Sequence, residues 1–415
     1  MERALLVGVG SKSRSSLIRA SLSELTRLAD TAGAVVVGET TQALARFNPA
    51  TLIGEGKVSE IAGMCAGLRA GTVIFDLELT PGQQKHLEKA LPRVKIVDRT
   101  RLILDIFARR ARTSEGRLQV ELAQLSYMLP RLTGAWREFS QQAGGIGTRG
   151  PGERKLEYER RHIQLRIAHL HTELERVRAA RRLRRERRAG VPVPQIALVG
   201  YTNVGKSTLL NHLTGEASAY ADDKLFATLD PTARRVRLPE GGWAVATDTV
   251  GFIRRLPTTL IAAFRSTLEE VEAADVLLVV CDASSPELEE QRASVEETLA
   301  DLDTAGIPRV EAFNKADRLS AEQRADLERR HPGAALLSAA DGEGVPEVLR
   351  RLESALDGRW LKREIDVPHR NSALASRFYE SAQVLGRETR GGKTRYRLRV
   401  TPENWKRLQA LLSAC

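Results

Sequence analysis

Cysteine is scarce in this chain: its 415 residues include only three, Cys65, Cys281 and Cys415, which lie far apart. None belongs to a CxxC pair or to a histidine-rich stretch, which argues against a disulfide framework and against a structural zinc site. No apolar run approaches the roughly 20 residues that cross a bilayer, and the run Ala4 to Val9 is too short for a signal peptide. The composition also lacks the bias of collagen or of disordered chains. These absences predict packed domains, a cytoplasmic location and no transmembrane segment.

The length and the charge distribution indicate several domains with different surroundings. A chain of 415 residues is expected to form two to four domains. The net charge is +11, and an acidic central segment, residues 192–358, lies between two basic segments, 1–191 and 359–415. Basic segments of this kind favour a polyanionic partner, with RNA, DNA and an anionic membrane all open. The alternative is that the charge only solvates the surface.

Residues 1–112 are predicted to form an α/β domain. The short apolar runs Val35–Val37, Val73–Leu77 and Val94–Val97 are rich in β-branched residues, and helix-like stretches lie between them. Gly8-Val-Gly10 lacks the third glycine of a dinucleotide-binding loop, so we interpret it as a plain turn between a strand and a helix.

Residues 113–190 are predicted to form an antiparallel helical hairpin. Leucines at 118, 122, 125, 129 and 132, and apolar residues at 163, 167, 170, 174 and 177, both step by four, three, four and three. The glycine-rich segment 143–152 between them prevents a continuous helix and is expected to form an exposed tip loop. Eight arginines among residues 176–188 make the end of the second helix strongly cationic, before Val191-Pro-Val-Pro194 ends it.

The rest of the chain predicts two further domains. In residues 192–358, apolar strands alternate with helices, which is typical of a mostly parallel sheet with helices on both faces. Residues 359–415 predict a small α+β domain in the order strand, helix, strand, strand, helix. The fold class is therefore α/β and multidomain.

A glycine-rich segment of the central domain fits the pattern GxxxxGK[ST]. It is Gly200-Tyr-Thr-Asn-Val-Gly-Lys206-Ser207, placed between a predicted strand and a predicted helix as the pattern requires. Its glycines let backbone N–H groups converge on phosphate oxygens, Lys206 brings positive charge, and Ser207 can bind Mg²⁺. The segment predicts a nucleoside triphosphate site with Mg²⁺ as cofactor.

Three more segments, each at a predicted strand end, identify the nucleotide. Asp248-Thr-Val-Gly251 offers a carboxylate for Mg²⁺ through water and an amide for the γ-phosphate. Asn314-Lys-Ala-Asp317 ends in a carboxylate that accepts hydrogen bonds from the ring N–H and amine of guanine, and adenine has no equivalent donors. Ser338-Ala-Ala340 is placed to offer amides to the guanine oxygen. Together the four motifs predict GTP, with contacts from Gly200, Tyr201, Thr202, Asn203, Val204, Gly205, Lys206, Ser207, Thr208, Asp248, Thr249, Val250, Gly251, Asn314, Lys315, Ala316, Asp317, Ser338, Ala339 and Ala340.

These motifs and three other segments resemble the HflX family of ribosome-associated GTPases, within the Obg–HflX superfamily. The segments are Asn48-Pro-Ala-Thr-Leu-Ile-Gly-Glu-Gly-Lys57, Gly144-Gly-Ile-Gly-Thr-Arg-Gly-Pro-Gly-Glu153 and Leu225-Phe-Ala-Thr-Leu-Asp-Pro231. The resemblance covers nearly the whole chain and is weakest after residue 360. It implies a cytoplasmic GTPase that binds the large ribosomal subunit and its RNA, and that splits or recycles stalled ribosomes or assists ribosome biogenesis.

The resemblance also implies particular residue roles. Switch I would be Phe226, Ala227, Thr228, Leu229 and Asp230, with Ser207 and Thr228 as the two protein ligands of Mg²⁺. Arg154-Lys155 depart from the family, which more often has Thr-Gln there. The C-terminal tail differs too much from the family for a function to be assigned to it by resemblance.

Position 252 holds phenylalanine, where many GTPases have a glutamine that positions water. A phenyl ring cannot orient water, so we assign no catalytic residue. We expect slow intrinsic hydrolysis of GTP to GDP and phosphate, with stimulation by the ribosome. The alternative is that another polar side chain takes over this role.

The partner is the least determined part of the prediction. The residues expected to contact RNA are Arg149, Arg176, Arg178, Arg181, Arg182, Arg184, Arg185, Arg187 and Arg188. Two other functions stay open: a GTPase that remodels RNA or modifies tRNA, and a signalling switch with a protein effector. We expect a monomer in solution.

Overall fold

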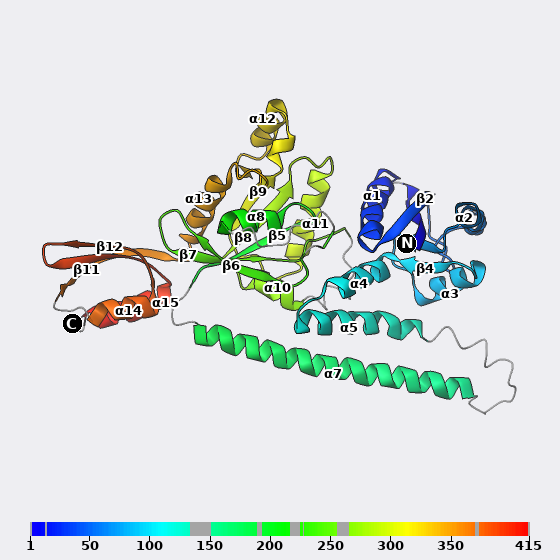
Figure 1. The fold of residues 1–415 in the computed structure, drawn as a ribbon, viewed down its shortest axis with the longest axis horizontal. Coiled ribbons are helices and arrows are strands. Elements are labelled where there is room, and N and C mark those ends of the chain that lie inside the picture. Colours follow the sequence, from blue (N-terminus) through cyan, green and yellow to red (C-terminus); the bar gives the residue numbers. More distant parts are fainter. Residues whose placement is uncertain are drawn as a thin grey trace. The chain divides into compact units, whose positions relative to one another are not determined.

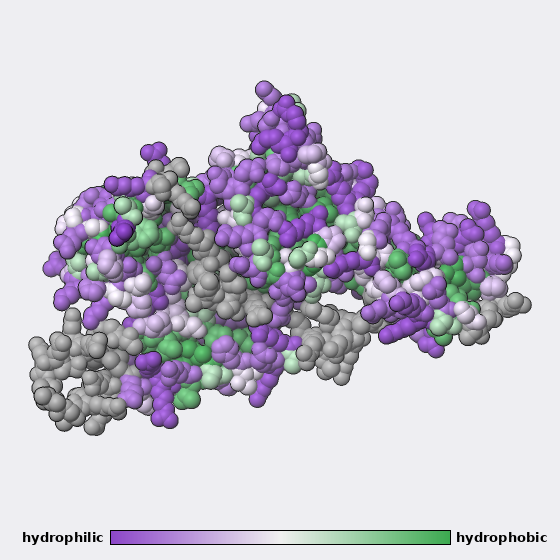
Figure 2. Space-filling view, turned by 180° about the vertical axis from the view of Figure 1, so that it is seen from behind, coloured by the Kyte–Doolittle hydropathy of each residue, from purple (hydrophilic) through white to green (hydrophobic). Residues whose placement is uncertain are grey.

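A computed structural model describes residues 2–12, 15–132, 151–188, 193–215, 225–226, 228–254, 265–369 and 373–413 (Figure 1). Two compact units make up the chain. The first comprises residues 1–177, 224–226 and 256–264, and the second comprises the remaining residues. Hydrophilic residues cover most of the face drawn in Figure 2. Among the described residues, no helix is both long and apolar enough to cross a membrane.

The first unit contains a four-stranded parallel sheet in the order β2-β1-β3-β4. Its elements, in chain order, are β1 (Glu2–Ser11), α1 (Ser15–Thr31), β2 (Ala34–Leu44), α2 (Glu55–Leu68), β3 (Thr72–Phe75), α3 (Pro81–Ala90), β4 (Lys95–Asp98) and α4 (Arg99–Arg110). A core that includes Leu5, Val73 and Phe75 fills the space under α2 and α3. The predicted α/β domain is confirmed.

The turn predicted at Gly8-Val-Gly10 is wrong, because both glycines lie inside β1, which continues to Ser11. A Cβ atom at Gly8 would lie 2.7 Å from Leu22, and one at Gly10 would lie 2.7 Å from Ile18. Glycine is therefore needed here so that α1 can pack closely on the strand, and not for a turn.

The helical hairpin forms from α5 (Ser114–Met128), the 3-10 turn η2 (Leu129–Arg131) and α7 (Pro151–Arg188). Leu122, Leu170 and Leu174 are buried together between the helices, as the seam predicted. Two helix ends differ from the prediction. The first helix ends at Met128 because Pro130 cannot continue it, and the second begins at Pro151, inside the predicted loop 143–152, because proline suits the first turn of a helix.

The second unit contains a six-stranded sheet in the order β10-β9-β8-β5-β7-β6, in which only the β6–β7 pair is antiparallel. Its strands are β5 (Gln195–Gly200), β6 (Thr232–Arg237), β7 (Trp243–Asp248), β8 (Val276–Asp282), β9 (Arg309–Asn314) and β10 (Ala335–Leu336). Its helices and 3-10 turn are α8 (Lys206–Thr214), α10 (Arg265–Glu272), α11 (Leu288–Ala300), η3 (Ala316–Arg318), α12 (Ala321–Arg330) and α13 (Val345–Leu356). The predicted, mostly parallel sheet is confirmed.

The C-terminal part also belongs to the second unit, and it has the predicted element order. The elements are β11 (Leu361–Pro368), α14 (Ala373–Ser381), β12 (Gln383–Arg390), β13 (Lys393–Val400) and α15 (Pro402–Ser413), with the antiparallel strand order β11-β13-β12. Phe378, Leu398 and Leu408 form its core. The domain limits placed at residues 112, 190 and 358 remain our proposal.

Candidate functional site

The predicted phosphate loop connects β5 to α8 and has the backbone shape that its glycines allow. Gly205 has a φ of +92°, and a Cβ atom there would lie 2.3 Å from Asn314 Nδ2. Lys206 is 7% exposed, and its ammonium group donates to the carbonyl oxygens of Gly200 (3.2 Å) and Tyr201 (3.0 Å). The loop therefore curls around the lysine head group, and its conformation lets backbone amides point toward a polyphosphate.

Three oxygen-bearing side chains from separate segments meet beside this loop. Ser207 Oγ donates to Asp248 Oδ2 (2.6 Å), Thr228 Oγ1 donates to the same oxygen (2.8 Å), and the two hydroxyls lie 2.9 Å apart. Asp248 is 1% exposed, and its other oxygen, Oδ1, has no hydrogen-bond partner in the described part of the chain. Two half-buried hydroxyls beside a buried carboxylate that has one oxygen unpaired form a set of hard oxygen donors, which fits Mg²⁺. Ser207 and Thr228 would hold the ion directly, with Asp248 acting through water.

The titration of Lys206 makes the site sensitive to pH. Burial lowers the pKa of Lys206 to about 8, and Asp248 opposes this shift only in part. The charged form binds phosphate, so GTP affinity is expected to fall by about tenfold between pH 7 and pH 9, with uptake of a proton on binding. Titration calorimetry in buffers of different ionisation enthalpy measures both effects. An affinity that stays constant over this range would contradict the assignment of Lys206.

The predicted guanine-recognition segments also meet the phosphate loop. Asn314 Nδ2 donates to the carbonyl oxygen of Val204 (2.7 Å), and Asn314 Oδ1 accepts the Ala339 amide (2.8 Å). Lys315 Nζ donates to the carbonyl oxygen of Asn203 (2.8 Å) and to Asp282 Oδ2 (2.6 Å). The structure thus brings the phosphate loop, the segment Asn314–Asp317 and the segment Ser338–Ala340 together. Asp282 was not predicted, although it stands at the end of the apolar strand β8.

Asp317 lies at the rim of this arrangement with its carboxylate available. It is exposed on η3, and among the described residues its side chain has no hydrogen bond or ion pair. The Ala316 amide donates to the carbonyl oxygen of Leu337 (3.0 Å), which fixes the turn that carries Asp317. A fixed backbone and an unpaired carboxylate suit recognition of a base edge.

The predicted switch I residues fall into two groups. Thr228 bonds to Asp248 beside Ser207, as described above, and Leu229 and Asp230 follow it in the second unit. Phe226 belongs to the first unit, where its ring meets that of Phe107 edge to face at 4.6 Å between centroids. The GTP contact expected of Phe226 stays a prediction. Ala227 lies outside the described residues.

The segment after Asp248 is fixed to the phosphate loop. The Phe252 amide donates to the carbonyl oxygen of Gly200 (3.0 Å), and the Thr202 amide donates to that of Phe252 (2.8 Å). The Phe252 side chain is 2% exposed, so its ring belongs to the core. A Cβ atom at Gly251 would lie 2.8 Å from Thr202 Cα, so a side chain there would push the two segments apart.

Tyr201 and Arg254 form an anchor that the sequence did not predict. The Arg254 amide donates to the Tyr201 hydroxyl (2.8 Å), and its guanidinium pairs with Glu287 Oε2 (3.0 Å). No pattern in the sequence pairs a residue of the phosphate loop with one that is 53 positions later. Tyr201 was predicted only as one letter of the loop motif, whereas its side chain holds the segment after Gly251.

Only two of the arginines expected to contact RNA have described side chains. Arg176 is exposed, whereas Arg178 Nε lies 3.5 Å from Glu269 Oε1 on α10, so its charge is partly neutralised within the chain. Arg149 lies outside the described residues, as do the side chains of Arg181, Arg182, Arg184, Arg185, Arg187 and Arg188, whose backbone is helical. The RNA contacts stay a prediction.

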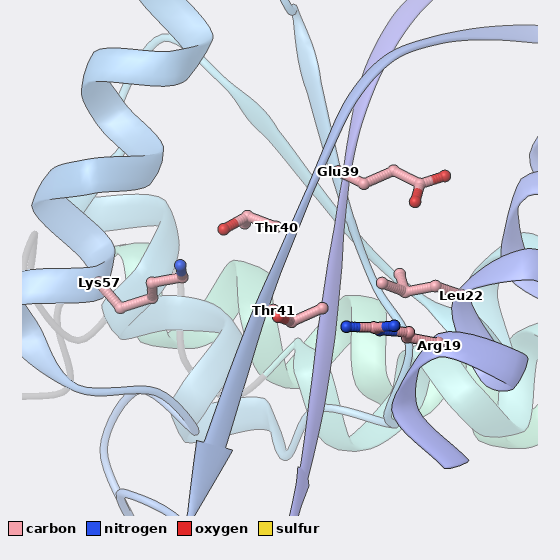
Figure 3. Close-up of a pocket in the computed structure, with 6 residues that line it drawn as sticks. All are labelled: Arg19, Leu22, Glu39, Thr40, Thr41 and Lys57. Atoms are coloured by element: carbon pink, nitrogen blue, oxygen red, sulfur yellow. The ribbon is translucent and has the colours of Figure 1, made fainter. Parts of the chain in front are cut away.

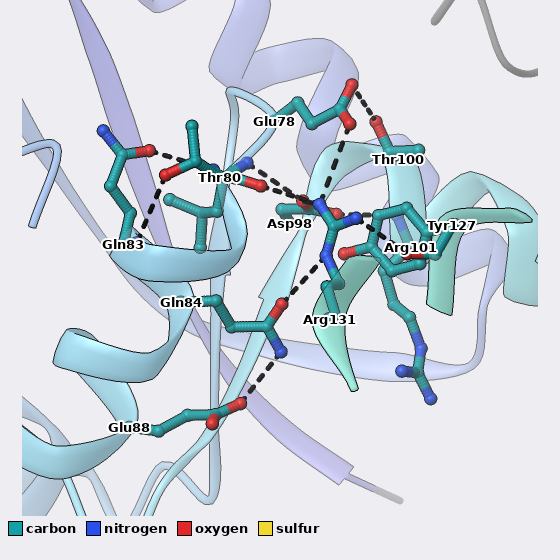
Figure 4. A network of polar contacts seen from close by, with 11 residues as sticks. Glu78, Thr80, Gln83, Gln84, Glu88, Asp98, Thr100, Arg101, Tyr127 and Arg131 are labelled. Atoms are coloured by element: carbon teal, nitrogen blue, oxygen red, sulfur yellow. Dashed lines mark hydrogen bonds and ion pairs between the residues drawn. The ribbon is translucent and has the colours of Figure 1, made fainter. Parts of the chain in front are cut away.

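Arg131, the last residue of η2, is bound from several sides (Figure 4). Its guanidinium donates to the carbonyl oxygen of Leu79 (2.7 Å) and to Gln84 Oε1 (3.1 Å), and lies 3.4 Å from Asp98 Oδ2. Its central carbon also lies 3.4 Å from the centre of the Tyr127 ring, whose hydroxyl has its pKa raised by burial and then by Asp98. This network holds the end of the first hairpin helix on the sheet of the first unit.

A cavity of about 550 Å³ lies along the edge strand β2 of the first unit (Figure 3). Its lining residues are Arg19, Leu22, Glu39, Thr40, Thr41 and Lys57. Lys57 Nζ is already paired with Glu60 (2.7 Å). The cavity contains none of the predicted GTP residues.

Comparison with known proteins gives three family matches along the chain. Residues 19–108 match the family "GTP-binding GTPase N-terminal", residues 110–188 match "GTP-binding GTPase Middle Region", and residues 195–327 match "50S ribosome-binding GTPase". Together the matches extend over the greater part of the chain.

Whole proteins and solved structures are similar as well. "GTPase HflX" of Caldanaerobacter subterraneus subsp. tengcongensis is 54% identical over 318 residues, which cover 77% of this chain and 73% of that protein. "GTPase HflX" of Escherichia coli (strain K12) is 42% identical over 391 residues, 93% of this chain and 91% of that protein. A GTP-binding protein from the archaeon Sulfolobus solfataricus, crystallised with GDP, is 24% identical with a TM-score of 0.44, over 86% of this chain and 99% of that chain.

Proposed function

Since the chain belongs to the HflX family of GTPases and hydrolyses GTP to GDP and phosphate, we propose that it acts on the large ribosomal subunit. In its GTP-bound form it binds this subunit and its RNA, and it splits or recycles stalled ribosomes or assists ribosome biogenesis. The cytoplasm is the compartment that this role requires. The observation that carries the proposal is the buried Phe252 ring, which leaves hydrolysis dependent on a partner.

The chemistry of the site supports this dependence. Ser207 and Thr228, with Asp248 through water, would hold Mg²⁺, which would supply positive charge to the phosphates. Lys206 adds a positive charge, and the backbone amides of residues 203–207 would bind phosphate oxygens. These groups bind and orient the triphosphate, but none of them orients the attacking water. We therefore expect the ribosome to complete the catalytic arrangement.

The charge of the chain indicates how the partner is recognised. The acidic GTP-binding segment 192–358 lies between basic segments, and the end of α7 carries eight arginines among residues 176–188. Ribosomal RNA supplies the matching polyanion, and its binding releases counterions. A protein effector would not need a cationic run of this density.

Neutralising four arginines of α7 tests the partner directly. The quadruple change to glutamine keeps helix propensity almost unchanged, so folding, GTP affinity and basal hydrolysis are expected to survive. Ribosome affinity should fall, the slope of log affinity against log salt should become shallower by up to about four, and ribosome-stimulated turnover should be lost. The four residues are Arg181, Arg182, Arg184 and Arg185.

Sedimentation with large subunits at several salt concentrations, and steady-state hydrolysis with and without subunits, measure these effects. The matched control makes the same charge change on arginines that pair with Asp326 and Glu347 in the central segment. It should keep the wild-type salt slope. An unchanged slope and full stimulation in the α7 variant would place the interface elsewhere. The control replaces Arg329, Arg330, Arg350 and Arg351.

A further inference from the structure

The hairpin of β6 and β7 joins the Mg²⁺ side chains to the C-terminal part of the chain. At one end, Thr232, which lies four residues after Thr228, pairs with Asp248. At the other end, Arg237 pairs with Trp243, and residues 238–242 form the tip. The ladder runs through six residue pairs without a bulge, over about 17 to 20 Å. The ladder links the tip to the Asp248 end of β7, and that end is also paired with β5 from Val245 to Asp248.

The tip is held by residues that lie far from it in the sequence. Gln383, the first residue of β12, donates from Nε2 to the carbonyl oxygen of Trp243 (2.6 Å). Glu353 of α13 accepts the Glu240 amide at Oε2 (2.9 Å). Glu240 also pairs through its own carboxylate with Lys362 of β11 (2.6 Å). The contacts thus involve both main-chain and side-chain atoms of the tip.

Glu353 connects the tip to the interior of the C-terminal sheet. Its Oε1 atom accepts a hydrogen bond from Arg399 of β13. Arg399 is 0% exposed and Glu353 is 3% exposed, so the two charges are buried together. A buried pair of this kind fixes one arrangement, because removing either partner leaves an uncompensated charge.

The glycines of the tip fit the C-terminal sheet closely. Gly241 has a φ of +101°, and a Cβ atom there would lie 2.8 Å from the carbonyl oxygen of Leu385. Gly242 has a φ of +75°, and its Cβ would lie 2.4 Å from Gln383 Oε1. The left-handed conformation favours glycine in any such tip, but the close approach of β12 demands it.

We infer that Glu353, Gln383 and the sheet of β11, β12 and β13 position the GTP site by holding this hairpin. In the described arrangement the tip is docked while Thr228 and Ser207 both bond to Asp248. The docked tip therefore stabilises the arrangement of Ser207, Thr228 and Asp248 that GTP with Mg²⁺ needs. GDP has no γ-phosphate, so its binding depends less on the position of Thr228. By linkage, GTP also stabilises the docked C-terminal part.

Gly241→Ala in the full chain tests this inference without ribosomes. The added methyl group meets main-chain atoms of β12 and is expected to push the tip away. Affinity for a non-hydrolysable GTP analogue should fall by about fivefold or more, with GDP affinity nearly unchanged. Hydrogen exchange of residues 383–400 should be slower with the analogue than with GDP in the wild type, and this difference should disappear in the variant.

Gly392→Ala is the matched control, because Gly392 also has a left-handed φ, +79°, but has open space around it. It should keep the wild-type ratio of the two affinities and the exchange difference. If Gly241→Ala does not fold, Gln383→Met removes the bond to Trp243 at similar volume and should shift the ratio in the same direction. The inference would be overturned if hydrogen exchange of residues 383–400 in the wild type were identical with the analogue and with GDP. It would also be overturned if Gln383→Met kept the wild-type ratio of analogue affinity to GDP affinity.

Discussion

Asp317→Asn is expected to weaken GTP binding by about 30- to 5,000-fold and to let the protein bind xanthosine triphosphate instead. The carboxylate accepts two hydrogen bonds from guanine, and losing a charge-assisted pair that the base covers costs about 2 to 5 kcal/mol. An amide instead offers an NH₂ group to the 2-oxo oxygen that replaces guanine's amine. The Asp317 side chain is exposed, and no described residue forms a hydrogen bond or ion pair with it that would oppose this exchange.

Titration calorimetry with both nucleotides measures the switch. Asp326→Asn is the control, since Asp326 pairs with Arg329 (2.7 Å) and Arg330 (2.9 Å) on the surface of α12. Its change should leave both affinities as they are in the wild type. Undiminished GTP affinity in Asp317→Asn would show that another group selects the base.

Ser207→Asn is expected to remove most of the Mg²⁺-dependent part of GTP binding. The serine hydroxyl is one of the two hydroxyls that bond to Asp248 Oδ2, and the larger amide cannot occupy the same space. Losing a group that binds the metal itself should cost more than the roughly 10- to 100-fold seen when an outer partner is lost. Fluorescence titration of GTP with and without Mg²⁺ measures the difference.

A second hydroxyl on the same helix provides the control. Thr214 Oγ1 bonds to carbonyl oxygens of α8, including that of Leu210 (3.0 Å), at the far end from the phosphate loop. Thr214→Ala should keep the full Mg²⁺ dependence. If Ser207→Asn also keeps it, the hydroxyl is not a metal ligand.

The motifs of the candidate GTP site could be located from the sequence, because each one lies within a single short segment. The phosphate loop and the segment Asn314–Asp317 each follow an apolar strand, and parallel strands bring such ends to one edge of a sheet. The contacts between segments were not predictable. Asp282 beneath Lys315, and the Tyr201 hydroxyl under Arg254, depend on how distant strands align, and no spacing in the chain encodes that alignment.

The fold was predictable where apolar residues mark the elements. The strand β6 was missed because its sequence, TARRVR, carries three arginines, which an edge strand paired on one side only can tolerate. The start of α7 at Pro151 was missed because proline was treated as a breaker, although it is favoured in a first helical turn. The contact of the tip glycines with β12 is a tertiary contact between segments about 140 residues apart.

Sedimentation of the unaltered protein with purified large ribosomal subunits tests the central claim most directly. The protein is incubated with a non-hydrolysable GTP analogue, with GDP and without nucleotide, at one moderate salt concentration. The account predicts that it pellets with the subunits in the presence of the analogue and much less in the other two states. Binding that is absent in all three states would contradict a ribosomal role, and binding that is equal in all three would contradict control by GTP.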